Sequence, residues 1–368
     1  MNKKETNRVQ SLIKTSRQVL GDCALENGAI VAANVEKAYY PRTAHNYHYV
    51  WPRDASYICV AADFLKLPIQ EPFFDWLTER PEDFKKEGIL FQRYSPNGRM
   101  ELRQFQPDQT GTVLWAIHHH FKDSPSQTYK YEALIRRLAD GLCNYWRESY
   151  FFLNTTDLWE EGHRRTSTKM ENNFTYSLAA CARGLKLAYQ MLNQEEWLKV
   201  ADQMVARIEM AYDQKEKYFL RNYGKIKDPN VDASLLGLAW PFEIVKANDQ
   251  RMVNTVKKIE ERIVIGGGVH RYEMDYYDGE GSGQEGAGAW PLLNFWLSIY
   301  YSVKGEKKKA LEYYHWVLER IEPDNLIPEQ IFDDFRKGIK PLAWSHAMFI
   351  IASQYLGYLP KSTLVNQS

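Results

Sequence analysis

The sequence predicts an all-α protein, a single-domain (α/α)6 toroid in which six helical hairpins close into a ring. Apolar residues recur at helical spacing along the whole chain. The connections between these segments alternate in length, with short turns after every second helix and long loops after the others. This alternation collects the long loops on one face of the toroid, and loops of this length inside a compact domain are usually functional.

Each helix is predicted from an apolar stripe of period 3.6. One stripe is Phe174, Leu178, Cys181 and Leu185, and Trp197 begins the next. The expected helices, in chain order, are 6–20, 53–65, 70–86, 109–122, 128–149, 170–191, 195–212, 232–245, 249–262, 288–303, 306–320 and 341–356.

A minor β-hairpin is the clearest strand signal. The stretch 88–105 reads GILFQRYSPNGRMELRQF, and Asn97-Gly98 is a two-residue turn of the kind that joins antiparallel strands. The hairpin falls inside a long loop, so it does not disturb the helical plan.

Odd-numbered helices are expected in the outer ring and even-numbered helices in the inner ring. Small residues on the sixth helix (Ala179, Ala180, Ala182 and Gly184) and the second (Ala61 and Ala62) allow close approach on several sides. The long loops fall near 21–52, 87–108, 150–169, 213–231, 263–287 and 321–340. The competing architecture is a two-domain helical protein, but no linker rich in Pro, Gly or Ser divides the chain. We therefore expect one domain, 1–368.

Charge and cysteine content exclude several classes of protein. The chain has 47 basic and 47 acidic residues, so neither nucleic acid nor a membrane surface is expected as a partner. No apolar run approaches the roughly 20 residues of a membrane span. The N-terminal segment lacks the apolar core of a signal peptide, so a cytoplasmic location is expected. Four widely spaced cysteines indicate neither disulfides nor a zinc site.

Aromatic residues are abundant, at 14% of the chain. They can pack in a helical core or stack against the flat C–H faces of sugars, and composition leaves both uses open.

Carboxylates recur in the long loops. Glu160 lies in DLWEEGHRR and Glu329 in NLIPEQIFDD, and the topology brings both loops to one face. A pair of carboxylates facing one cavity suits glycosidic bond cleavage, with one acid to protonate the leaving oxygen and one base. The neighbours Trp159 and Glu161 are expected to raise the pKa of Glu160, as an apolar group and a like charge do. Pro328 fixes the backbone just before Glu329.

A family resemblance adds to this interpretation. The motifs NYHYVWPRDAS, DLWEE, GGGVHRYEMDYY and IPEQ with PLAWSHA, in this order, resemble glycoside hydrolase family 15, the glucoamylase and glucodextranase family. The resemblance runs from about Gly28 to Ala347. It implies an (α/α)6 barrel and an inverting, exo-acting hydrolase that removes α-linked glucose from the non-reducing end.

The resemblance also implies roles for single residues. Glu160 resembles the general acid and Glu329 the base that activates water. Arg53 and Asp54 resemble the pair that holds the terminal glucose, and Arg271 an arginine that binds its hydroxyls. The remaining candidate substrate-binding residues are Tyr47, Trp51, Asp108, Leu158, Trp159, Glu161 and Trp344.

The chain leaves no room for the β-sandwich domain or the starch-binding module that many members carry. This favours soluble oligosaccharides as substrates. Trehalose or α-1,6-linked dextrins are alternative substrates for the same machinery, and a catalytically silent sugar-sensing module is an alternative of another class. Phosphorolysis is disfavoured because the carboxylate of Glu329 would repel phosphate.

Two further motifs are set aside. Gly281 to Gly286 spells GxGxxG but lacks the strand–turn–helix context, and Glu280 and Glu285 would repel a pyrophosphate. His118-His119-His120 are consecutive, whereas helical zinc pairs use positions i and i+4, so a structural role is expected. No cofactor and no metal are predicted, and the sequence does not indicate an oligomeric state.

Overall fold

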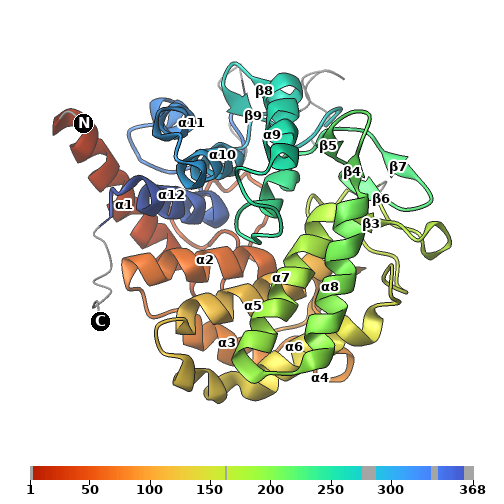
Figure 1. Cartoon of the computed structure of the whole chain (residues 1–368). Helices are drawn as coiled ribbons and strands as arrows, with labels where there is room; N and C mark the ends of the chain where they lie inside the picture. Colours follow the sequence, from red (N-terminus) through yellow and green to blue (C-terminus); the bar gives the residue numbers. More distant parts are fainter. Residues whose placement is uncertain (1–2, 162–163, 276–286, 333–338, 360–368) are drawn as a thin grey trace, which may run out of the picture.

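Helices arranged in two concentric rings make up the protein (Figure 1). The computed structural model describes residues 3–161, 164–275, 287–332 and 339–359. The inner ring consists of α2 (Pro52–Leu65), α5 (Pro107–Phe121), α7 (Thr175–Leu192), the 3-10 helix η3 (Ala233–Leu238), α10 (Pro291–Lys304) and α12 (Ala343–Leu356). The outer ring consists of α1 (Lys3–Cys23), α3 (Gln70–Glu79), α6 (Glu132–Tyr145), α8 (Glu195–Met210), α9 (Gln250–Ile263) and α11 (Lys307–Arg320).

The inner ring is closed. Each inner element contacts the next one along the chain, and α12 returns to contact α2. Inner and outer helices alternate, as the alternating loop lengths predict, so the (α/α)6 toroid is confirmed. Because the inner helices have neighbours on all sides, most of their residues are buried.

Small residues allow the inner helices to approach closely, as expected. A Cβ added at Gly111 on α5 would lie 2.5 Å from the backbone of Ala180 on α7, and one at Gly184 would lie 2.6 Å from the carbonyl oxygen of Gly111. Any side chain at these glycines would force the two helices apart.

Aromatic rings fill the interior of the barrel. The ring of Tyr57 on α2 lies 5.1 Å from Trp115, 6.0 Å from Trp296 and 5.2 Å from Trp344, measured between centroids. Core packing is therefore one of the uses of the abundant aromatics.

Some predicted helices are shorter than expected. The third ends at Glu79, because Pro81 cannot continue the hydrogen-bond ladder, and the short helix α4 (Phe84–Glu87) follows. The fifth starts as a 3-10 helix, η1 (Pro125–Tyr131). The prediction of an eighth α-helix over 232–245 is wrong: this segment forms η3 and then turns. Pro241 lacks an amide proton and would clash with the carbonyl of Gly237 in an α-helix.

The strands are short and lie in the long loops. β1 (Phe91–Tyr94) pairs antiparallel with β2 (Met100–Phe105), which confirms the hairpin. The connection spans residues 95–99 and is longer than the predicted two-residue turn, with Gly98 at φ +89°. The other small elements are η2 (Thr168–Met170), β3 (Asn173–Phe174), β4 (Tyr212–Asp213), β5 (Tyr218–Phe219), β6 (Asn222–Tyr223), β7 (Lys227–Asp228), β8 (Val264–Ile265) and β9 (Gly268–Val269). Because every long loop leads from an outer to an inner element, these loops and the first turns of the inner helices share one end of the barrel.

Candidate active site

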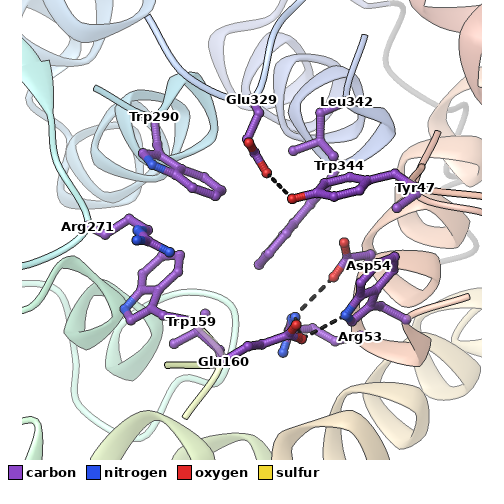
Figure 2. Close-up of a pocket in the computed structure, with 13 residues that line it drawn as sticks. Tyr47, Arg53, Asp54, Trp159, Glu160, Arg271, Trp290, Glu329, Leu342 and Trp344 are labelled. Atoms are coloured by element: carbon purple, nitrogen blue, oxygen red, sulfur yellow. Dashed lines mark hydrogen bonds and ion pairs between the residues drawn. The ribbon is translucent and has the colours of Figure 1, made fainter. Parts of the chain in front are cut away.

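A pocket opens where the long loops meet the N-terminal ends of the inner helices. It encloses about 520 Å³ of space, with the open solvent at its mouth included. Its walls come from segments far apart in the sequence (Figure 2). The lining residues are Ala32, Tyr47, Trp51, Arg53, Asp54, Leu158, Trp159, Glu160, Arg271, Trp290, Glu329, Leu342 and Trp344.

Glu160 occupies one wall of the pocket on an unusual backbone conformation. Its φ is +67°, a left-handed value that costs energy for a residue with a Cβ. The Glu160 amide donates to the side chain of Asp157 (3.1 Å) and to its carbonyl oxygen (3.2 Å). This turn stabilises the strained conformation from which the side chain enters the pocket.

The Glu160 carboxyl group is held by three donors. Its Oε1 accepts from Trp51 Nε1 at 2.7 Å and lies 3.5 Å from Arg53 Nη2, and its Oε2 accepts from Gln92 Nε2. The pKa of Glu160 is raised to about 7, mainly by burial and with a smaller contribution in the same direction from the nearby charge of Asp54. Arg53 and the two uncharged donors act in the opposite direction. Burial prevails, so a large fraction of Glu160 is protonated near neutral pH.

The adjacent carboxylate of Glu161 is not a main cause of this shift, whereas burial, the effect expected of an apolar neighbour such as Trp159, is the largest cause. The prediction that Glu161 repels Glu160 is wrong, because the Glu161 carboxylate turns to Arg271 Nη2 (3.1 Å) and the Tyr272 hydroxyl (2.8 Å). The main causes are burial and Asp54, which is remote in sequence.

Glu329 lies on the opposite side of the pocket from Glu160 (Figure 2). Glu329 is only 5% exposed. Its Oε1 accepts from the Tyr47 hydroxyl at 3.0 Å, and its backbone amide donates to Ile339 O at 2.7 Å. Glu329 is thus fixed both at its backbone and at its carboxylate.

Arg53 and Asp54 lie in the first turn of α2, and both line the pocket. Arg53 Nε lies 3.2 Å from Asp54, and Nη1 lies 3.0 Å from Asp108. The Arg53 guanidinium also lies 5.3 Å from the ring centre of Trp344. Burial raises the pKa of Asp54 to about 6, although Arg53 opposes this. Asp108 is fully buried behind Arg53 and is absent from the lining, so it orients Arg53 instead of facing the cavity.

Arg271 enters the pocket from the loop after α9. Asp275 holds its guanidinium with two bonds, of 2.7 Å and 2.6 Å. The guanidinium lies 5.5 Å from the ring centre of Trp159 and 4.9 Å from that of Trp290. The cation is therefore presented to the cavity between two indole rings, where it can donate to hydroxyl groups.

A buried ion network supports the loop that carries Glu160. Arg164 lies 3.1 Å from Asp157 and 2.8 Å from Asp232, and Trp159 Nε1 donates to Asp232 at 3.0 Å. Asp232 also caps η3 by accepting from Ser234 N. Asp232, at the start of η3, thus fixes both Trp159 and, through Arg164, the turn at Asp157.

The structure brings together most of the candidate site residues. Ten of the twelve line the pocket, namely Tyr47, Trp51, Arg53, Asp54, Leu158, Trp159, Glu160, Arg271, Glu329 and Trp344. Asp108 and Glu161 lie behind the wall and bind Arg53 and Arg271.

Sequence reasoning missed Gln92, Trp290, Leu342, Ala32 and Asp232. Gln92 and Asp232 carry no motif of their own. Trp290 could have been noticed, since it directly precedes Pro291 at the N-terminus of an inner helix.

The two motifs set aside in the sequence have different outcomes. His119 and His120 both bond to Asp63 on α2, at 2.8 Å and 2.7 Å, in the structural role expected for the histidine run. The described part of the chain contains no cluster of three or more His, Cys, Asp or Glu side chains arranged to hold a metal ion. The GxGxxG motif at 281–286 lies outside the described residues. Among the helices of the described ranges, none is both long and apolar enough to span a bilayer.

Comparisons with known proteins identify the family of this chain. The family model of glycosyl hydrolases family 15 matches residues 86–354. An uncharacterized glycosyl hydrolase of Methanocaldococcus jannaschii is 30% identical over 95% of this chain, and the chain spans 56% of that relative's length. Isomaltose glucohydrolase of Kribbella flavida is 24% identical over 97% of this chain and 95% of its own length. Trehalase 2 of Sulfolobus acidocaldarius is 24% identical over 82% of this chain and 55% of its own length.

A solved structure described as a wild-type glycosidase has the same fold. Its TM-score is 0.77 at 23% identity, and the match covers 98% of this chain and 100% of that one. Because the family model covers well over half of the residues, and the Methanocaldococcus relative reaches 30% identity over nearly the whole chain, the assignment follows directly. The chain belongs to glycosyl hydrolases family 15.

Proposed function

We propose that the protein is an inverting, exo-acting α-glucosidase of the glucoamylase type, which removes α-linked glucose from the non-reducing end of soluble oligosaccharides. One observation carries the proposal. Glu160 and Glu329 face one pocket from opposite walls, and each is held by its own set of partners.

Glu160 is the general acid. A pKa of about 7 keeps a large part of this carboxyl group protonated near neutral pH, which a donor to the glycosidic oxygen requires. Glu329 is the general base, and it activates a water that attacks the anomeric carbon from the other face. In inverting enzymes the two carboxyl groups leave room for that water, and the product has the opposite anomeric configuration.

The pocket supports exo action. Arg53, Asp54 and Arg271 offer charged groups to the hydroxyls of a terminal sugar, and Trp344 offers an apolar surface beside them. A terminal unit fits such a pocket, whereas the middle of a chain needs an open groove. We propose that residues 1–368 form one catalytic domain.

A second candidate is cleavage of α-1,6 linkages in short substrates. The observation in its favour is the match to isomaltose glucohydrolase, which extends over 95% of that protein's length. Trehalose is a third substrate to include, because a trehalase is among the relatives.

A panel of disaccharides tests the proposal. Maltose, isomaltose and trehalose are incubated with the purified chain, and the anomer released is followed by proton NMR. We expect β-glucose as the first product from at least one of them. Only the newly formed anomeric centre reports the mechanism: release of α-glucose alone from trehalose, or an initial excess of α-glucose from maltose or isomaltose, would overturn inversion. Stabilisation against heat by glucose, with no hydrolysis of any α-glucoside, would identify a silent sugar-sensing module instead.

The Glu329→Gln protein is the matched control for this panel. It keeps the size of the side chain and its acceptor for the Tyr47 hydroxyl, so the fold is expected to survive. Wild-type turnover by this variant would refute the assignment of the base.

A further inference from the structure

The two oxygens of the Glu160 carboxyl group have different partners. Oε1 faces Trp51 Nε1 at 2.7 Å and Arg53 Nη2 at 3.5 Å. An indole N–H and a guanidinium can donate hydrogen bonds but cannot accept them. A proton on Oε1 would point at two donors, so the protonated form of Glu160 carries its proton on Oε2.

Oε2 has a partner of another kind. Among the described residues its hydrogen bond is to the side-chain amide of Gln92, on strand β1. A primary amide has a donating NH2 group and an accepting oxygen, and rotation by 180° exchanges them. Of the three partners of Glu160, only Gln92 can bond to both the ionised and the protonated carboxyl group.

The amide oxygen of Gln92 is free to make that exchange. Gln92 Oε1 is buried, and no residue in the described ranges donates a hydrogen bond to it. A buried acceptor without a donor is costly, and native structures rarely keep one without a reason. Because Gln92 Oε1 accepts no hydrogen bond from the described residues, rotation of the amide does not break one at this atom.

We propose that Gln92 is a positioning residue that keeps the transferable proton of Glu160 on Oε2 and follows the loss and return of that proton by rotation of its amide. The inference rests on the proposed role of Glu160 as the general acid. With Glu160 ionised, Gln92 Nε2 donates to Oε2. With Glu160 protonated, Oε2–H donates to Gln92 Oε1. Rotation about the C–O bond then turns the same proton toward the glycosidic oxygen.

The backbone of Gln92 is tied to the same site. Its carbonyl oxygen accepts from Gln109 Nε2 at 3.0 Å, and Gln109 Oε1 accepts from the backbone amide of Arg53 at 2.6 Å. This chain of hydrogen bonds ends at Arg53, which is followed by Asp54, and these are the two charged residues that shift the pKa of Glu160. The main chain of Gln92 is thus fixed while its side-chain amide remains able to turn.

The test is the replacement of Gln92 by Met. This change keeps the length of the side chain and removes the amide that bonds to the ionised and to the protonated form of Glu160. Gln104→Met is the matched control, because Gln104 lies on the paired strand β2 and is not one of the three hydrogen-bond partners described for the Glu160 carboxyl group. The titration of Glu160 is followed by carboxyl 13C NMR, with its resonance assigned as the one missing in Glu160→Gln. Since a bond to a charged group is stronger than one to a neutral group, Gln92→Met should raise the pKa by about one unit.

Turnover gives a second measurement. On a disaccharide, whose leaving oxygen needs the proton, Gln92→Met should lower kcat roughly tenfold with KM nearly unchanged. On α-glucosyl fluoride, whose leaving group needs little protonation, the loss should stay below about threefold. Gln104→Met should leave kcat unchanged on both substrates. If Gln92→Met does not fold, Gln92→Glu replaces it, and a second carboxyl group beside Oε2 should raise the Glu160 pKa further.

Two results would overturn the inference. One is an unchanged Glu160 titration in Gln92→Met and Gln92→Glu. The other is an equal loss of kcat on both substrates, which would indicate general damage to the pocket. The titration needs no turnover, so an inactive wild type with a shifted titration would refute the proposed function and leave the pairing of Gln92 with Glu160 intact.

Discussion

The two walls of the pocket hold their glutamates in different ways. The acid wall surrounds Glu160 with an indole, a guanidinium and an amide, and sets its backbone at φ +67°. The base wall holds Glu329 through the hydroxyl of Tyr47 and a backbone bond to Ile339. The Glu160 side chain is 21% exposed, whereas the whole of Glu329 is 5% exposed.

This difference shows how one residue type serves two roles. An acid must bind a proton and release it within each turnover, so it needs a raised pKa and a partner that tolerates both states. A base must present its carboxylate in a fixed direction, and the hydrogen bond from Tyr47 contributes to this at Glu329. The following predictions test the contrast between the two walls.

The largest effect is expected from Glu329→Gln. Water must be activated whatever the leaving group, so kcat should fall by about 10² to 10⁴ on both maltose and α-glucosyl fluoride. Steady-state assays on the two substrates measure this. A loss confined to maltose would show that Glu329 is not the base.

Glu160→Gln should show the opposite dependence on substrate. Maltose turnover should fall by about 10² to 10⁴, because the leaving oxygen is no longer protonated. Hydrolysis of α-glucosyl fluoride should fall less than about tenfold. For each variant, the loss of kcat on maltose is divided by the loss of kcat on α-glucosyl fluoride. Equal ratios for Glu160→Gln and Glu329→Gln would remove the distinction between the walls.

Tyr47→Phe tests the base wall with a smaller change. It removes the hydroxyl that donates to Glu329 Oε1 and leaves the ring, which packs 5.5 Å from that of Trp51. A hydrogen bond to a charged group is worth about 1.5–3 kcal/mol, so a kcat loss of roughly 10- to 100-fold is expected. Tyr49→Phe is the control, because Tyr49 also packs near Trp51 and is absent from the pocket lining. Equal losses in both variants would contradict a specific role for Tyr47.

The smallest effect concerns stability. Glu160 has a pKa of about 7 in the folded protein and an ordinary value of 4.5. Between these values the folded protein binds the proton more tightly than the unfolded chain, so the free energy of unfolding falls as pH rises. Relative to Glu160→Gln, the wild type should lose on the order of 1–3 kcal/mol between pH 4 and pH 7.5.

Chemical denaturation of both proteins across this pH range measures the difference. Asp157, whose pKa burial also raises to about 6, contributes to both proteins and largely cancels, whereas the coupling of Asp54 to Glu160 is part of the measured difference. A difference in stability that does not change with pH would show that Glu160 titrates normally.

Periodicity and loop lengths predicted the ring because they report local geometry. An apolar stripe of period 3.6 determines which face of a helix is buried, and a short turn determines that its neighbour runs antiparallel. The predicted α-helix over 232–245 does not form for an equally local reason. Pro241 and Gly237 disfavour an α-helix, and here they outweigh the apolar pattern.

The site was predictable where chemistry and motif coincide. Glu160, Glu329, Arg53 and Asp54 stand in recognisable motifs and line the pocket. Gln92 stands in no such motif, because a glutamine on a short strand has no signature apart from the group that it meets.

The sequence by itself determined the helical ring, the end at which the long loops gather, and the two glutamates that they carry. Only the tertiary structure decided which charges meet. It turned Glu161 away from Glu160 toward Arg271, brought Asp54 close instead, and assigned different partners to the two oxygens of Glu160. The physical reason is that burial and Coulomb interactions depend on distances in space, and separation along the sequence does not determine these distances when long loops intervene.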